Sequence, residues 1–248
     1  STEFVGIFLE NSADWVALFW GLLQAGFKPI LLNTRHNISI TNEIIKDMDP
    51  VFVVSEDVRV DKAVSVKDLL AAGKGTKFDK SMIKWADEII LITSGSTSKP
   101  KIISHSGKTI CLQVEMSEDI VRKNQSIQYN AKLDIHNLAF LPFYHIFGLT
   151  AVYIWFAFFS RTFVQLNDLA PQTILNTIRR HKVTHIFAAH FQAEAIQAGG
   201  ILEHDGGHKT QQQDHANAVD IAFILGIDLL SGDALHSSGQ PQAQHPAA

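Results

Sequence analysis

The chain alternates short, β-branched apolar runs with longer amphipathic stretches, and this alternation restricts its fold more than any other feature. Seven segments have the strand-like pattern: residues 5–9, 30–32, 51–54, 89–92, 138–141, 163–166 and 183–187. Short apolar runs separated by helical stretches are typical of strands buried on both faces and covered by helices. We therefore predict an α/β fold with mostly parallel sheets covered by helices.

Two helices can be delimited from the sequence. The first is expected over residues 13–25, with Ser12 as N-cap and Gly26 ending it. Its apolar side chains recur at helical spacing and predict one buried face: Trp15, Leu18, Phe19, Leu22 and Leu23. The second opens at Pro171, a residue favoured in the first helical turn, and directs Ile174, Leu175 and Ile178 inward. Both faces are predicted to join the core.

Composition excludes several classes of protein. Of 248 residues 46% are hydrophobic, which predicts a globular protein with a real core. A formal net charge of -4 without a basic cluster gives no reason to expect a nucleic-acid partner. The most apolar run, residues 146–159, falls short of the roughly 20 residues of a membrane span. Cys111 stands alone, so we expect no disulfide, a cytoplasmic protein and a small buried apolar role for this thiol.

The segment Leu91-Ile-Thr-Ser-Gly-Ser-Thr-Ser-Lys-Pro-Lys101 gathers hydroxyls, a glycine and two lysines directly after an apolar run. Backbone N–H groups and short hydroxyls donate to phosphate oxygens, glycine allows close approach, and lysine adds positive charge. The pattern differs from the Walker motif, because no second glycine precedes Lys99. Composition alone leaves open a plain polar turn that only links two elements.

This segment closely resembles the signature Thr-Ser-Gly-Thr/Ser-Thr-Gly-x-Pro-Lys of the AMP-forming adenylating enzymes, which include acyl- and aryl-CoA ligases, luciferases and peptide-synthetase adenylation domains. Ser98 stands where that family usually has glycine. Residues 141–149, Leu-Pro-Phe-Tyr-His-Ile-Phe-Gly-Leu, resemble the downstream motif Pro-Leu/Phe-x-His-x-x-Gly-Leu. Residues 24–33 resemble the family's early Ala-Gly-x-x-x-x-Pro-Leu-Asn region. Three segments in the right order support one resemblance.

The resemblance implies a reaction in which a carboxylic acid attacks Mg-ATP to give an acyl-adenylate and pyrophosphate, after which a thiol such as coenzyme A takes the acyl group. It implies ATP phosphate binding by the hydroxyl-rich segment, through Thr93, Ser94, Gly95, Ser96, Thr97 and Lys101. It places His145 at the wall of the acid pocket, with Phe143 and Tyr144 shaping apolar surface around it. Without the motif, His145 is a strand-end histidine satisfied by backbone. We assign no catalytic or metal-binding residue.

The resemblance ends at Ala188, after which glutamine and histidine accumulate. The family also carries a Tyr-Gly-x-Thr-Glu segment for magnesium and adenine, an aspartate for ribose and a lysine on a small C-terminal domain; we find none of them after Ala188. We therefore predict a partial, truncated AMP-binding domain over residues 1–188, and an atypical tail over 189–248 that is a non-native continuation or partly disordered. A metal cluster in that tail is disfavoured because its spacing fits no fixed element: His204, Asp205, His208, Asp214 and His215.

Two hypotheses remain at this point. The first is a fragment of an acid–thiol ligase that acts on a small carboxylic acid, with an apolar, fatty or aromatic acid favoured by the residues around His145. The second is a non-catalytic or inactive truncated module that binds nucleotide. Carboxylate-dependent ATP–pyrophosphate exchange distinguishes them.

Overall fold

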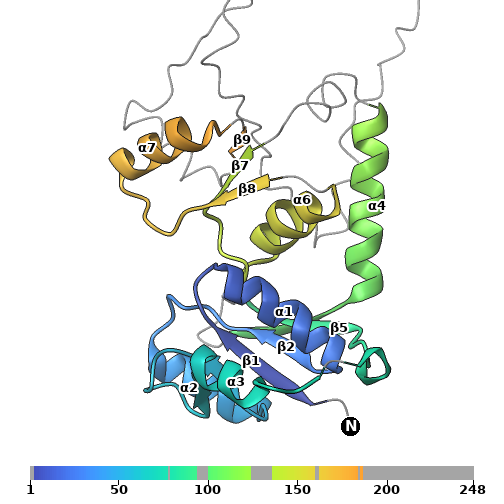
Figure 1. The fold of residues 1–248 in the computed structure, drawn as a ribbon, viewed down its shortest axis with the longest axis vertical. Coiled ribbons are helices and arrows are strands. Elements are labelled where there is room, and N and C mark those ends of the chain that lie inside the picture. The colour runs from blue at the N-terminus through green and yellow to red at the C-terminus, as the bar shows by residue number, and fades with distance from the viewer. Residues whose placement is uncertain are drawn as a thin grey trace, which may run out of the picture.

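A six-stranded sheet underlies the first part of the chain (Figure 1). The structure, a computed structural model, describes residues 3–77, 79–93, 100–123, 136–159, 162–183 and 185–186. The strands are β1 (Phe4–Phe8), β2 (Lys28–Leu31), β3 (Val53–Ser55), β4 (Ala63–Val64), β5 (Glu88–Thr93) and β6 (Lys101–Ser106). Their order is β4-β3-β1-β2-β5-β6, and all neighbours are parallel except β5 and β6, which form an antiparallel pair.

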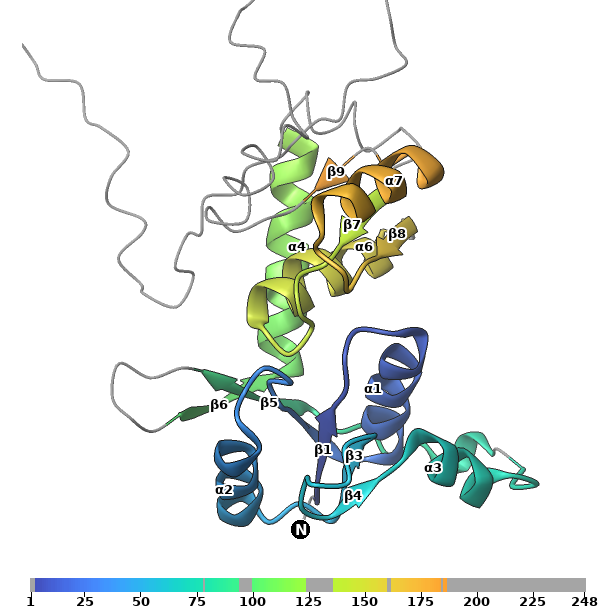
Figure 2. The same cartoon turned by 90° about the vertical axis from the view of Figure 1, so that its left-hand side faces the viewer.

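Helices cover both faces of this sheet, as buried parallel strands require. Figure 2 shows α1 (Ala13–Ala25) and α2 (Ile38–Met48) on opposite sides of β1, with α3 (Val66–Gly73) on the side of α1. A short 3-10 turn, η1 (Lys80–Met82), precedes β5. The caps of α1 confirm the sequence prediction: the Trp15 N–H donates to Ser12 Oγ at 3.0 Å, and Gly26 adopts φ 86°. A Cβ at Gly26 would also stand 2.8 Å from the Lys84 carbonyl oxygen, so glycine is required there twice over.

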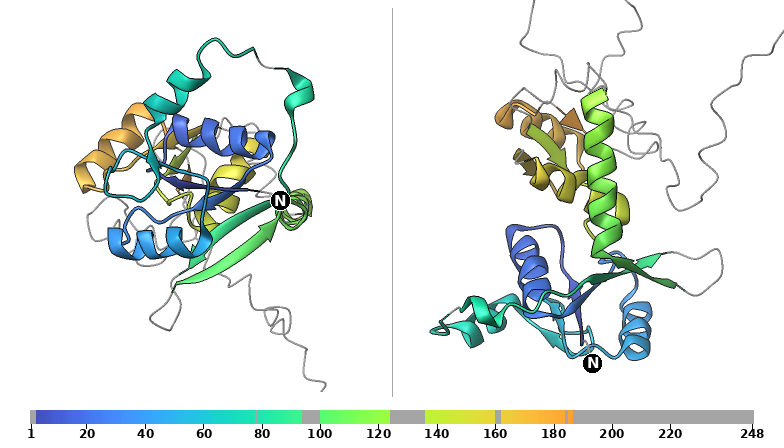
Figure 3. Two further views of the ribbon diagram at one scale, coloured as in Figure 1. Left: turned by 90° about the horizontal axis from the view of Figure 1, so that it is seen from below. Right: turned by 90° about the vertical axis from the view of Figure 1, so that its right-hand side faces the viewer.

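A second, three-stranded parallel sheet has the order β8-β7-β9. Its strands are β7 (His136–Ala139), β8 (Thr162–Gln165) and β9 (His185–Ile186). Between β7 and β8 lie a π-helical segment, η2 (Gly148–Ile154), and α6 (Trp155–Phe158); α7 (Pro171–His181) follows β8. The long helix α4 (Gly107–Lys123) leaves the end of β6 and runs beside the second sheet (Figure 3).

The largest hydrophobic cluster joins the two sheets through α1. Trp15 stacks on Phe19 with ring centroids 5.1 Å apart, and contacts Phe143 and Tyr153 edge-on at 5.2 and 6.1 Å. The predicted inner face of α1 is confirmed for Trp15, Phe19, Leu22 and Leu23, while Leu18 is only partly buried. A smaller cluster fills the α2 side of the six-stranded sheet. One core therefore holds the two sheets together.

The predicted fold class is confirmed, with differences in detail. All seven predicted strands are present, but the sequence did not predict β4 or β6, and β6 adds an antiparallel edge to the parallel sheet. On the predicted inner face of α7, Ile174 is buried, and Leu175 and Ile178 are half-buried. Cys111 is exposed on α4, so its predicted burial was wrong. In the described part of the chain we find no helix with the length and apolar character of a membrane span. The tail of residues 189–248 lies outside the described residues.

Candidate nucleotide and substrate site

The hydroxyl-rich segment connects the two strands of the antiparallel pair β5 and β6. Thr93 pairs with Lys101 at the end of this ladder, so both ends of the connection are fixed by strand register. Thr93 is half-buried at the carboxyl end of β5, and Lys101 is exposed on the outer strand. Of the predicted phosphate-binding residues, Ser94, Gly95, Ser96 and Thr97 lie outside the described residues. The structure thus shows the two strand ends, at Thr93 and Lys101, from which the hydroxyl-rich connection begins and to which it returns. We call this pair of strand ends the hairpin base.

The position of Thr93 and Lys101 in the sheet supports a binding role for these two residues. β5 is parallel to β2 and β2 to β1, so the carboxyl ends of these three strands share one edge of the sheet. Ligands of open α/β sheets bind outside the carboxyl ends of the strands. Thr93 therefore lies at the sheet edge where a ligand is expected.

His145 lies in a tight turn that follows β7. Its backbone N–H donates to the Pro142 carbonyl at 3.1 Å, and its own carbonyl accepts from the Leu149 N–H at 2.9 Å. The Phe147 N–H donates to His145 Nδ1 at 3.3 Å, which leaves Nε2 as the protonated nitrogen of the neutral ring. The residue is exposed, yet nearby protein atoms displace part of its water, and this desolvation lowers the pKa of His145. A neutral, exposed imidazole at this place can contact a ligand.

The structure explains why the motif of residues 141–149 has a glycine at position 148. A Cβ built on it would stand 2.2 Å from the Pro142 carbonyl oxygen and 3.1 Å from that of Leu141. Both atoms belong to backbone, which cannot move aside as a flexible side chain can. The glycine in His-x-x-Gly is thus required by the close approach of η2 to the turn that carries His145.

Phe143 and Tyr144 occupy different surroundings. Phe143 is fully buried and packs on Trp15 and Tyr153, the latter with ring centroids 5.0 Å apart. Burial raises the pKa of the Tyr144 hydroxyl, and opposing influences come from the Arg35 charge and a side-chain hydrogen bond with Thr34. Both rings belong to the largest core cluster, and Tyr144 additionally meets polar groups that follow the carboxyl end of β2. The pocket role predicted for both residues stays a prediction.

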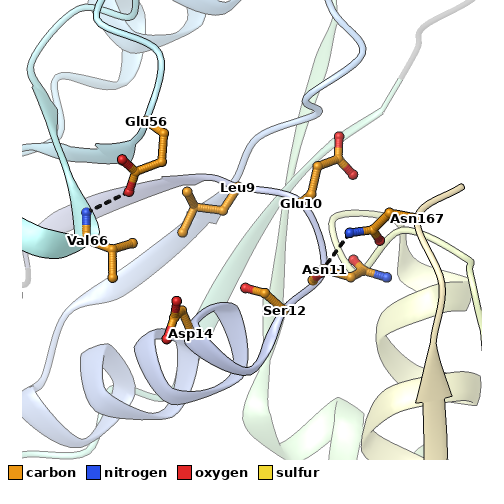
Figure 4. A pocket seen from close by; sticks show the side chains of 8 residues that line it. All are labelled: Leu9, Glu10, Asn11, Ser12, Asp14, Glu56, Val66 and Asn167. Carbon is orange, nitrogen blue, oxygen red and sulfur yellow. Dashed lines mark hydrogen bonds between the residues drawn. The ribbon is translucent and has the colours of Figure 1, made fainter.

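Asn11 is the residue that sequence reasoning missed. Its Nδ2 donates to the Leu141 carbonyl at 2.9 Å, its Oδ1 accepts from the Phe143 N–H at 2.9 Å, and only 4% of it is exposed. Its backbone carbonyl accepts from Asn167 Nδ2 at 3.2 Å (Figure 4). One sequence signal could have identified Asn11. It is a polar residue between the apolar strand β1 and the N-cap Ser12, and such a residue lies at the carboxyl edge of the sheet.

An open hollow of about 230 Å³ lies at the same edge, beside the carboxyl ends of β1 and β3 (Figure 4). Its lining carries three carboxylates and no basic side chain: Leu9, Glu10, Asn11, Ser12, Asp14, Glu56, Val66 and Asn167. Within the described ranges no three His, Cys, Asp or Glu residues are grouped as metal ligands. The five acidic and histidine residues considered as a cluster in the tail lie outside those ranges.

Solved structures define the class of the fold. The o-succinylbenzoate CoA synthetase MenE of Bacillus subtilis, solved with ATP and a magnesium ion, matches with a TM-score of 0.62 at 21% identity. The match covers 79% of this chain and 41% of that one. The N-terminal domain of FACL13 from Mycobacterium tuberculosis matches with a TM-score of 0.61 at 18% identity, over 79% of this chain and 52% of that one. Likeness at this level of identity concerns the fold alone, and the chain has the fold of part of that domain.

The sequence assigns the family. The sequence model of the family described as AMP-binding enzyme matches residues 1–241, and this chain belongs to that family. A probable CoA ligase of Humulus lupulus, CCL11, is 28% identical over 162 residues, which are 65% of this chain and 25% of that protein. The hybrid PKS-NRPS synthetase fsa1 of Fusarium sp. (strain FN080326) is 30% identical over 141 residues, 49% of this chain and 4% of that protein.

The chain thus spans a quarter or less of these two relatives and about two fifths of the solved synthetase. The family match continues past residue 188, where the motif resemblance ended. The domain boundary predicted at that residue lies outside the described residues and stays a prediction.

Proposed function

We propose that this chain is the phosphate-binding part of an AMP-forming acid–thiol ligase. In the proposed reaction a carboxylate oxygen of the acid bonds to the α-phosphorus of Mg-ATP, and the α–β anhydride bond breaks to release pyrophosphate. A thiol such as coenzyme A then displaces AMP from the acyl-adenylate. Protein groups contribute to such a reaction chiefly by positioning and by stabilising charge.

One observation carries the proposal: Thr93 and Lys101 pair at the end of β5 and β6 that residues 94–99 connect, at the carboxyl edge of the parallel sheet. The pairing brings the two ends of a Ser/Thr-rich connection together and places an exposed ammonium beside it. We propose that Thr93, Ser94, Gly95, Ser96 and Thr97 donate to the β- and γ-phosphates, and that Lys101 supplies positive charge. These groups suit ATP phosphates, whereas the magnesium ion would enter with the nucleotide as part of the substrate.

His145 would form the wall of the acid pocket, with Tyr144 beside it. Its lowered pKa keeps the imidazole neutral near pH 7, so it would act by shape and hydrogen bonding. Phe143, fully buried, would act only by holding this turn in place. The apolar, fatty or aromatic nature of the acid, like the cytoplasmic setting, stays a prediction.

Carboxylate-dependent ATP–pyrophosphate exchange tests the proposal, with Lys101→Gln as variant. Lys108→Gln is the matched control, because Lys108 is also exposed and is the second residue of α4, outside the β5–β6 connection. We expect Lys101→Gln to weaken Mg-ATP binding about tenfold, the loss of one charge-assisted contact, and Lys108→Gln to leave it unchanged. Nucleotide binding without exchange would instead support the non-catalytic module. Equal effects of both variants would contradict the assigned site.

A further inference from the structure

The loop that carries His145 is attached to the six-stranded sheet through one buried side-chain amide. Asn11 Nδ2 donates to the Leu141 carbonyl and Asn11 Oδ1 accepts from the Phe143 N–H, both at 2.9 Å. Residues 141–143 form the bend at which the chain turns after β7, and the two hydrogen bonds span this bend. The Asn11 amide therefore holds the bend at both of its ends.

We propose that Asn11 is a positioning residue, whose amide fixes the turn bearing His145 to the carboxyl end of β1 and so sets the place of His145 relative to the β5–β6 hairpin. The inference rests on the proposed function, because His145 is assigned there to the acid pocket. Asn11 touches no predicted ligand site itself. Its effect on the reaction would pass entirely through the loop.

Asn11 itself is held in place by the elements on either side of it. Asn11 lies between β1 and the N-cap Ser12 of α1, and its carbonyl accepts from Asn167 Nδ2 at 3.2 Å. β1 is paired to β2 and β2 to β5, so Asn11 and Thr93 belong to one hydrogen-bonded sheet. A displacement of the loop at Phe143 reaches His145 directly, because the His145 N–H is bonded to the Pro142 carbonyl.

The amide cannot be replaced without loss. It is the uncharged side chain whose two ends offer one donor and one acceptor at this short reach. Alanine leaves the Leu141 carbonyl and the Phe143 N–H without their partner. An ionised aspartate still accepts from Phe143 but presents an oxygen to the Leu141 carbonyl oxygen. A protonated aspartate donates to Leu141 and restores both bonds.

The chain supplies a matched control. Asn42 makes the same kind of bridge, donating to the Arg59 carbonyl at 3.0 Å and accepting from the Asp61 N–H at 2.9 Å. It lies on α2, on the opposite face of the sheet from α1 (Figure 2). Asn42→Ala therefore removes a bridge with the same donor and acceptor pattern, at an exposed place remote from His145.

The experiment follows the imidazole resonances of His145 and His105 by NMR, together with the KM values for acid and ATP, in the wild type, Asn11→Ala, Asn11→Asp and Asn42→Ala. In Asn11→Ala we expect the loop to hydrate, so that the pKa of His145 rises toward its ordinary value while His105, on β6, does not change. The KM for the acid should rise about tenfold and the KM for ATP should stay. Asn42→Ala should leave all four quantities unchanged.

The Asn11→Asp variant provides a second, pH-dependent test. Asn11→Asp should show the alanine defect near pH 7 and lose it as the pH falls and the new carboxyl becomes protonated. The carboxylates of Glu10, Asp14 and Glu56 line the same hollow, so the wild type and Asn11→Ala are measured at every pH as references. Unchanged His145 resonances in Asn11→Ala, or equal shifts of His145 and His105, would overturn the proposal. If the wild type shows no exchange activity, the proposed function fails and the resonances still decide the positioning role.

Discussion

The two segments that resemble family motifs are built in opposite ways. Much of residues 141–149 is enclosed by the core around the exposed His145: Phe143 and Leu149 are 0% exposed, and Gly148 lies against the Pro142 carbonyl. Thr93 and Lys101 pair at the end of the β5–β6 ladder, where Thr93 is half-buried on β5 and Lys101 is exposed on the edge strand β6. The first segment is therefore specified mainly by packing, and the second is left available for a ligand.

The difference shows that a residue in a motif can serve either the packing of the fold or the binding of a ligand. In the enclosed loop the aromatic ring and the glycine serve the packing and stability of the fold. At the hairpin base, hydroxyl and ammonium groups make few demands on the fold, so their chemistry is explained better by a ligand. Substitutions should therefore reduce stability in the first segment and binding in the second.

The largest effect is expected from Phe143→Ala. Removing this fully buried ring leaves a cavity beside Trp15 and Tyr153, and we expect the free energy of unfolding to fall by about 4 kcal/mol. Phe158→Ala is the control, since Phe158 is 55% exposed on α6 and should change stability by less than about 1 kcal/mol. Denaturant unfolding measures both, and equal losses would contradict the enclosed loop.

Gly148→Ala should be next. The added methyl would stand 2.2 Å from a backbone oxygen, so η2 or the preceding turn must shift, at a cost of about 3 kcal/mol. Gly21→Ala provides the opposite case within α1, because nothing lies within 4 Å of its Cβ position. There we expect a gain of about 0.5–1 kcal/mol from helix propensity. A neutral Gly148→Ala variant in the same unfolding assay would show that the approach is not restrictive.

Much of this architecture could be predicted because local signals agreed with the fold. The caps of α1 and the seven apolar strands follow from residue type and spacing alone. β6 could not be predicted in this way: only His105 of its six residues is buried, so it lacks the apolar run that identified the other strands. β4, with two half-buried residues, gives still less signal.

The candidate site was predictable only where chemistry, rather than packing, determines the residue. Hydroxyls and lysine near residue 93 indicate phosphate from their donors alone. The amide of Asn11 has no such signature, because its partners lie 130 and 132 residues away and become neighbours only after folding. Phe143 was assigned to a pocket surface, and its burial against Trp15 depends equally on distant contacts.

At the hairpin base we expect almost no effect on stability. Thr93→Val keeps the β-branched shape in β5 and removes the hydroxyl, and Lys101→Gln removes an exposed charge. Each should change the free energy of unfolding by less than about 0.5 kcal/mol, while both weaken Mg-ATP binding. Thermal or denaturant unfolding beside a nucleotide titration measures the two quantities. Losses of stability as large as those in the enclosed loop would remove the distinction between the segments.

The smallest effect concerns the pH dependence of stability, and it extends the comparison along β6. His105 is buried opposite Ile89 in the β5–β6 ladder, and desolvation lowers its pKa below the ordinary histidine value of 6.5. As the pH falls below 6.5, the unfolded chain takes up a proton on this residue before the folded chain does, which favours unfolding. His105 should therefore add a fall in stability below pH 6.5 and no slope above it. Relative to the wild type, His105→Gln should become more stable as the pH falls from 6.5, by amounts that level off once the folded imidazole is also protonated. Unfolding curves at a series of pH values measure this difference, and a difference that does not vary with pH would show that the folded hairpin leaves His105 solvated.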